Sequence, residues 1–148
     1  MSPKRSQEEK INLGTAGEYL VAYHLCRRGY LANLTPRNYR SFDIHAYNPA
    51  NHKSVDIQIK TTDKKTGFPI GRGLKPIKEL KQSETVFVFV QLNHDVELYV
   101  VPARELARIM LDIVVPKYTH LDPEIQLWAI GRDELAPYKN KWSSLGLG

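Results

Sequence analysis

The chain has 148 residues, of which 42% are hydrophobic and 25% are charged, a composition typical of a globular domain. This length is enough to enclose one hydrophobic core, so the sequence predicts a single domain over residues 1–148. No apolar run approaches the ~20 residues of a membrane-spanning helix, and no apolar stretch follows the charged start as it would in a secretory signal. We therefore expect a cytoplasmic protein. The only cysteine, Cys26, excludes an internal disulfide, and we interpret it as a structural thiol.

The basic residues are concentrated in one segment. The chain has 21 Lys and Arg against 16 Asp and Glu, a net charge of +5 that favours polyanionic partners. Residues 60–81 contain seven basic and two acidic residues, and the rest of the chain has 14 of each. Because this segment is also rich in glycine and proline, we expect a basic loop there, between the strand that ends at Lys60 and the short helix that begins near Ile77. It is either a solvated surface loop or a nucleic-acid-binding surface that holds phosphates through Lys64, Lys65, Arg72, Lys75 and Lys78.

The first predicted element is a helix. Residues 1–11 are polar and are expected to be flexible. From Asn12 onward, a stripe of residues at spacings of three and four predicts a helix that ends near Gly29. The stripe consists of Gly14, Gly17, Glu18, Val21, Ala22 and Leu25.

Strands dominate the middle of the predicted fold. Alternating polar and apolar residues at 41–47 and 54–60 predict an antiparallel hairpin, joined by a turn. The other expected elements are a strand at 30–34, a short helix at 77–82, strands at 85–92 and 97–101, a helix at 103–114 and a strand-like piece at 125–130. This order predicts an α/β fold with a mixed central sheet flanked by helices.

Three polar side chains of the hairpin share one face of the sheet. If the turn closes symmetrically, Tyr47 pairs with Ser54, and Asp43 then stands opposite Gln58. Lys60 lies on the same face, two residues further along its strand. The same pattern in an arbitrary hairpin is usually an exposed cross-strand ion pair, which is the alternative interpretation.

The same register pairs His45 with Asp56, so we interpret Asp56 first as a histidine partner and only second as a metal ligand. Glu18 is the fourth candidate for the site. It lies within the apolar helical stripe, where a carboxylate is costly unless it is hydrogen-bonded or bound to a metal. A narrower stripe that leaves Glu18 in solvent is the alternative.

This set of groups suits metal-assisted cleavage of a phosphodiester. Carboxylate and amide oxygens bind Mg²⁺ or Mn²⁺, which neutralises charge on the phosphate and lowers the pKa of a bound water. A lysine ammonium can orient that water or stabilise the charged transition state.

The order of these residues resembles the PD-(D/E)XK nuclease superfamily, the restriction-endonuclease-like fold of Mrr-type enzymes and Holliday-junction resolvases. The resemblance covers residues 14–101 and rests on the helix glutamate, the SFDI segment and the DIQIKTT segment. It implies an αβββαββα core in which Asp43 and Gln58 bind the metal, Lys60 serves the attacking water and Glu18 supports the metal site. Two departures are Phe42, where the family has proline, and Gln58, where it has an acid; the latter resembles the QXK variants of Mrr-like members.

The resemblance implies a metal-dependent endonuclease that acts on DNA, and a homodimer would be usual if both strands are cut. Two other functions remain open. Gln58 favours a catalytically inactive nuclease-fold protein that binds nucleic acid or a protein partner. A plain interaction module, whose basic loop contacts an acidic protein, is the third possibility.

Overall fold

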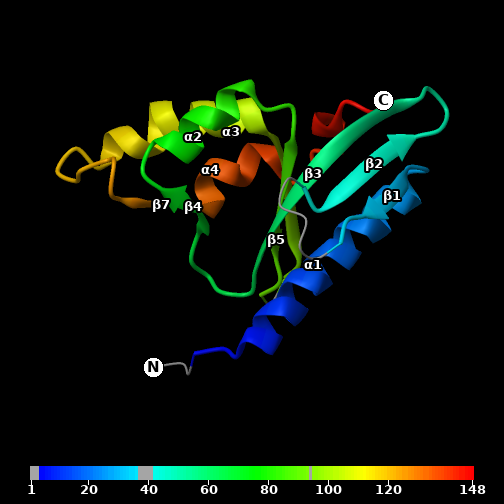
Figure 1. The fold of residues 1–148 in the computed structure, drawn as a ribbon, viewed down its shortest axis with the longest axis horizontal. Helices are drawn as coiled ribbons and strands as arrows, with labels where there is room; N and C mark the ends of the chain where they lie inside the picture. Colours follow the sequence, from blue (N-terminus) through cyan, green and yellow to red (C-terminus); the bar gives the residue numbers. More distant parts are fainter. Residues whose placement is uncertain (1–3, 37–41, 94) are drawn as a thin grey trace.

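The computed structural model describes residues 4–36, 42–93 and 95–148 (Figure 1). The larger of its two sheets is mixed, with strand order β1-β2-β3-β5-β6, and only the β3–β5 pair is parallel. Its strands are β1 (Leu31–Leu34), β2 (Ile44–Asn48), β3 (Lys53–Thr62), β5 (Val86–Gln91) and β6 (Glu97–Pro102). The smaller sheet pairs β4 (Phe68–Arg72) with β7 (Leu127–Ile130). The predicted α/β class with a mixed sheet is confirmed.

The helices are α1 (Gln7–Arg27), α2 (Lys75–Glu79), α3 (Ala103–Ile109) and α4 (Arg132–Leu135). Short 3₁₀ segments follow α2 and α4, a π-helical turn extends α3 over Met110–Val114, and a further 3₁₀ turn lies at Trp142–Leu145. Within the described residues, no helix is both long enough and apolar enough to cross a membrane.

The start of α1 differs from the prediction. The helix begins at Gln7 rather than at Asn12, so the described residues 7–11 are helical instead of flexible. Ser6 caps this end, because its hydroxyl accepts a hydrogen bond from the Glu9 backbone N–H at 3.1 Å. Acidic residues in the first turn add favourable interactions with the helix dipole. The end of α1 at Arg27 agrees with the predicted stop near Gly29.

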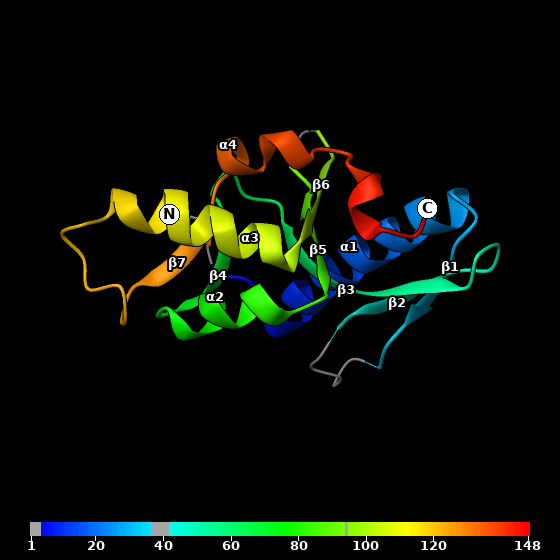
Figure 2. The same ribbon diagram turned by 90° about the horizontal axis from the view of Figure 1, so that it is seen from above.

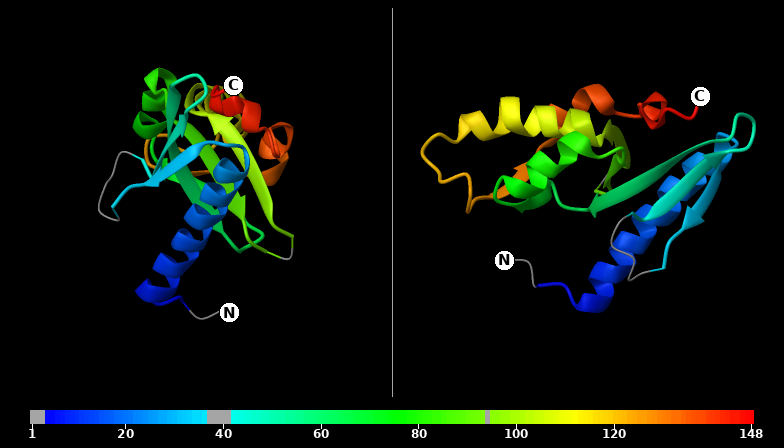
Figure 3. Two further views of the ribbon diagram at one scale, coloured as in Figure 1. Left: turned by 90° about the vertical axis from the view of Figure 1, so that its right-hand side faces the viewer. Right: turned by 45° about the horizontal axis from the view of Figure 1, so that its top comes forward.

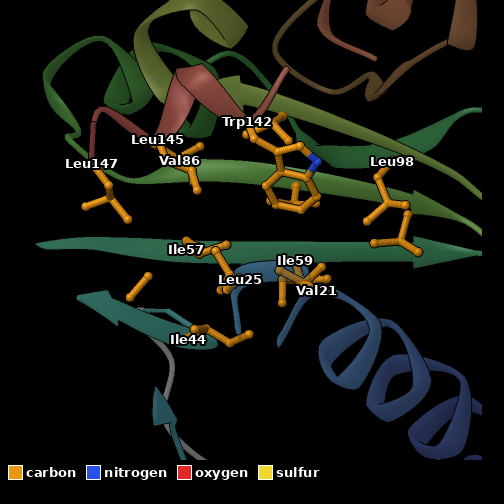
Figure 4. Close-up of a cluster of buried hydrophobic side chains, with 14 residues drawn as sticks. Val21, Leu25, Ile44, Ile57, Ile59, Val86, Leu98, Trp142, Leu145 and Leu147 are labelled. Atoms are coloured by element: carbon orange, nitrogen blue, oxygen red, sulfur yellow. The ribbon is translucent and has the colours of Figure 1, made fainter. Parts of the chain in front are cut away.

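The larger sheet separates two hydrophobic clusters. Alternate residues of β5 point into different clusters: Val88 packs in the first, and Phe89 packs in the second. In the first cluster, Val21 of α1 lies against Ile59 of β3, and Trp142 from the C-terminal segment joins them (Figure 4). The second cluster is formed with α2, α3, α4 and the smaller sheet, which lie together over β5 and β6 (Figure 2).

The sequence did not predict the smaller sheet. β4 lies within the segment expected to be a loop, and its partner β7 was anticipated only as a strand-like piece at 125–130. The two strands pair buried Phe68 with buried Ile130, and the register shifts between Pro69 and Gly71. Proline and glycine disfavour strands, so the sequence pattern did not indicate β4. Its long-range pairing with β7 stabilises it.

Cys26 is exposed, so its interpretation as a structural thiol is wrong. The side of α1 that faces the sheet carries buried Gly17, Val21 and Leu25. Each residue advances about 100° around a helix, so Cys26 is rotated out of this stripe even though it follows Leu25 directly.

Candidate active site

Asp43 stands immediately before β2, where β2 stops pairing with β3. The ladder between these strands has the predicted register, and its last pair joins Ile44 to Ile57. The expected pairing of Asp43 with Gln58 is absent from this described ladder, because the Asp43 N–H donates to the Ile57 carbonyl at 2.8 Å. The Asp43 side chain bonds to β3 instead: its Oδ2 accepts a hydrogen bond from the Ile59 backbone N–H at 2.7 Å. This bond fixes the carboxylate against the backbone of β3.

The groups around Asp43 shift the pKa of its carboxyl in opposite directions. Burial raises the pKa of the Asp43 carboxyl, while the Ile59 N–H and the Lys60 ammonium lower it. The pKa of Asp43 lies above its ordinary value overall, so the ionised carboxylate is less stable here than the same group would be in water. A cation placed beside Asp43 would compensate this cost.

Gln58 and Lys60 share one face of β3, as predicted. Their neighbours Ile57 and Ile59 are buried in the cluster that contains α1, so alternation places Gln58 and Lys60 on the opposite face. Both side chains line a cleft of about 280 Å³. Its other walls are Ile70, Pro76, Leu80 and Phe87.

Glu18 is positioned by a close contact between α1 and β3. Its neighbour Gly17 is buried, and a Cβ at position 17 would lie 3.0 Å from the Cβ of Thr61 and overlap the threonine hydroxyl. Only glycine therefore lets the helix approach β3 this closely. Glu18 is half-buried beside this contact. Its convergence with Asp43 and Lys60 on one metal stays a prediction.

His45 and Asp56 form the cross-strand pair that the register predicts. Nδ1 of His45 lies 2.7 Å from Oδ1 of Asp56, and each side chain is 42% exposed. At this exposure the pair contributes little to stability. Asp56 is therefore a histidine partner in the structure, which agrees with our first interpretation of it.

The five basic candidates are divided between the two ends of β4. Lys64 and Lys65 lie in the turn before β4, and both are exposed. Arg72 ends β4 and donates to the Ile125 carbonyl at 2.8 Å. Lys75 and Lys78 are exposed on α2, where they line a cleft of about 430 Å³. Glu79 and Glu124 line the same cleft, so acidic residues offset part of the positive charge there.

The residues that sequence reasoning missed are the cleft walls. Ile70 comes from β4, and Leu80 comes from the 3₁₀ turn after α2. Their apolar character was visible in the sequence. Their position beside Lys60 was not, because it depends on the packing of the smaller sheet and α2 against the larger one.

The donor set limits what kind of metal site is possible. Among the described residues, no group of three or more His, Cys, Asp or Glu side chains could hold a metal ion. Asp43 supplies one carboxylate, and Gln58 can add a neutral amide oxygen. Such oxygen donors fit Mg²⁺, which commonly takes one or two protein carboxylates and completes its coordination with water and substrate phosphate. Asp43 and Gln58 therefore carry oxygen donors of the kind that Mg²⁺ takes, and a magnesium site here stays a prediction.

No protein-family model matches this sequence, and no curated protein is significantly similar to it.

Proposed function

We propose that this protein is a metal-dependent endonuclease that hydrolyses DNA phosphodiester bonds, with the restriction-endonuclease-like fold of the PD-(D/E)XK superfamily. The main support is the anchored carboxylate of Asp43, which accepts a hydrogen bond from the backbone N–H of Ile59, the residue between Gln58 and Lys60 on β3. Gln58 and Lys60 share the cleft face of the adjoining strand. An acid beside one strand and an amide oxygen and a lysine on the adjoining strand are the groups that this reaction would use.

Each residue has a separate task in the proposed reaction. Asp43 and Gln58 would hold Mg²⁺ or Mn²⁺. The supporting role of Glu18 rests on the family resemblance alone, because α1 packs on the face of β3 opposite to Gln58 and Lys60. The bound metal supplies positive charge to the phosphate and lowers the pKa of a coordinated water. The Lys60 ammonium positions the attacking water and stabilises the negative charge that develops on the phosphate oxygens. The Ile59 N–H holds the Asp43 carboxylate in place throughout, since that bond belongs to the backbone of β3.

The basic residues at the two ends of β4 would hold the DNA backbone on either side of the cleft. Lys64 and Lys65 would contact phosphates at one end, and Arg72, Lys75 and Lys78 would do so at the other. The ends of a five-residue strand are separated by roughly 13 Å, a distance that spans several phosphates of one strand. Binding through such contacts weakens steeply as salt rises.

Purified protein incubated with plasmid DNA and with branched DNA tests this proposal. We expect cutting of at least one substrate in the presence of Mg²⁺ or Mn²⁺ and none with EDTA. Asp43→Asn keeps the shape of the side chain and an oxygen for the Ile59 N–H but removes the charge, so we expect it to abolish cutting. Asp112→Asn, at an exposed position in the π-helical turn, is the matched control and should remain active. Cutting that survives Asp43→Asn would refute the assignment.

A catalytically inactive nucleic-acid-binding protein is the second candidate function. Gln58 supports it, because an amide oxygen brings one negative charge less to the metal than a carboxylate does. Titration calorimetry with Mn²⁺ separates the two functions. Absence of metal uptake, combined with DNA binding that weakens with salt, would favour the inactive protein.

A further inference from the structure

The side of α1 that faces away from the sheet forms a continuous exposed stripe. Gly17, Val21 and Leu25 face the sheet, and the opposite side of the helix is turned outward (Figure 3). Tyr19 and Tyr23 on this side are 63% and 59% exposed, although aromatic side chains normally bury most of their surface. We call this surface the α1 outer stripe. It comprises the exposed residues Glu8, Asn12, Ala16, Tyr19, Tyr23 and Arg27.

The α1 outer stripe has the same spacing in both directions. Its successive intervals are four, four, three, four and four residues, so a twofold axis passing between Gly17 and Glu18 maps the stripe onto itself. All six positions fall within an arc of about 100° on the helix. A self-complementary surface of this kind is what a symmetric dimer interface requires.

An antiparallel pair of α1 helices would match unlike groups at every position. Glu8 would meet the partner's Arg27, since these residues lie at equal distances from the axis on opposite sides. Ala16 would meet the partner's Tyr19, so a large side chain faces a small one. Asn12 would meet the partner's Tyr23, which gives the phenol ring a polar neighbour.

We propose that the α1 outer stripe binds a second copy of this chain, so that two α1 helices pack antiparallel in a homodimer. Charge complementarity favours a second copy over an unrelated protein, because the acidic first turn and the basic last turn of the same helix satisfy each other. The stripe is about 29 Å long, so one helix pair forms a small interface and a micromolar dissociation constant is expected.

This arrangement leaves the cleft lined by Gln58 and Lys60 open in both protomers. The cleft lined by Gln58 and Lys60 is on the face of β3 opposite to α1. Each cleft would therefore point away from the dimer interface, and the two copies would engage separate DNA segments. The dimer does not depend on the proposed nuclease activity, so its test is independent of cleavage.

Charge reversal tests the dimer directly. Sedimentation equilibrium over a wide range of protein concentration should reveal a reversible monomer–dimer equilibrium in the wild-type chain. Glu8→Arg and Arg27→Glu each place like charges together at both ends of the helix pair, so each should raise the dissociation constant about tenfold. The double variant exchanges the two charges and should restore the wild-type value. Circular dichroism identifies any variant that unfolds.

A disulfide trap provides a second readout that does not depend on charge. In a Cys26→Ser background, Ala16→Cys combined with Tyr19→Cys should give covalent dimers on oxidation. Glu8→Cys combined with Asn12→Cys should give few, because each of these positions lies at least about 16 Å along the helix pair from both cysteines of the partner. A wild-type chain that stays monomeric at every concentration, or a double charge reversal that fails to restore association, would overturn the proposal.

Discussion

Replacement of Lys60 by alanine is expected to lower the rate of Mg²⁺-dependent DNA cleavage by about 10²–10³-fold, while metal binding persists. Lys60 lines the cleft together with Gln58, and its positive charge lowers the pKa of Asp43. Its loss removes stabilisation of the transition state but leaves the oxygen ligands in place. Single-turnover cleavage measures the first effect, and Mn²⁺ calorimetry measures the second.

Lys65→Ala is the matched control for this substitution. Lys65 is an exposed lysine in the turn after β3, so its loss should weaken DNA binding modestly without changing the rate of the bound complex. If Lys60→Ala cleaves as fast as the wild type, or if Lys65→Ala lowers the single-turnover rate at saturating DNA by as much as Lys60→Ala does, the role assigned to Lys60 is wrong.

Gly17→Ala is expected to destabilise the fold by about 1–3 kcal/mol, even though alanine favours helices. A methyl group at position 17 would overlap the Thr61 hydroxyl and lie 3.0 Å from the Thr61 Cβ, so α1 and β3 would have to separate. The same shift would displace Glu18 relative to Asp43. Thermal and urea unfolding measure the change in stability, and the cleavage assay measures the functional consequence.

Gly14 offers a control one helical turn earlier. A Cβ at position 14 would have no described heavy atom within 4 Å beyond the helix's own backbone and the neighbouring residues. Gly14→Ala should therefore stabilise the chain by up to about 1 kcal/mol through helix propensity alone. Combining Gly17→Ala with Thr61→Ala removes the overlapping hydroxyl and should recover part of the lost stability. Equal effects at positions 14 and 17 would contradict the close contact between α1 and β3.

Local signals explain which parts of the fold the sequence predicted. The hairpin register was correct because a symmetric turn and strict alternation fix it, and the structure pairs Tyr47 with Ser54 as expected. The run at 85–92 was recognised as a buried strand because β-branched and aromatic residues fill it. The early start of α1 was missed even though its signal is local, a serine followed three residues later by a glutamate, because the segment is polar.

Long-range packing determined what the sequence could not predict. β4 and β7 are far apart in the chain, and neither has an apolar pattern that identifies its partner. The basic residues were expected on one loop and the short helix after it, but β4 divides them between its two ends. Residues distant in the sequence can be assigned to a common surface only once the elements between them are placed.

In the candidate site, too, the local pattern was predicted from the sequence and the contacts between strands were not. Alternation correctly placed Gln58 and Lys60 on one face of β3. It did not reveal that the ladder ends before Asp43, so that the carboxylate itself takes the Ile59 N–H. That hydrogen bond orients the Asp43 carboxylate. It forms where β2 and β3 stop pairing, and the alternation of polar and apolar residues does not show where a ladder ends.

A crystal of the wild-type protein soaked in Mn²⁺ and measured for anomalous scattering tests the proposed metal site most directly. We expect an anomalous peak about 2.1 Å from a carboxylate oxygen of Asp43, with the Gln58 amide oxygen among the ligands and Lys60 nearby. The peak should be absent from crystals of Asp43→Asn. A wild-type crystal without this peak, or with manganese bound only elsewhere, would show that Asp43 does not hold a metal.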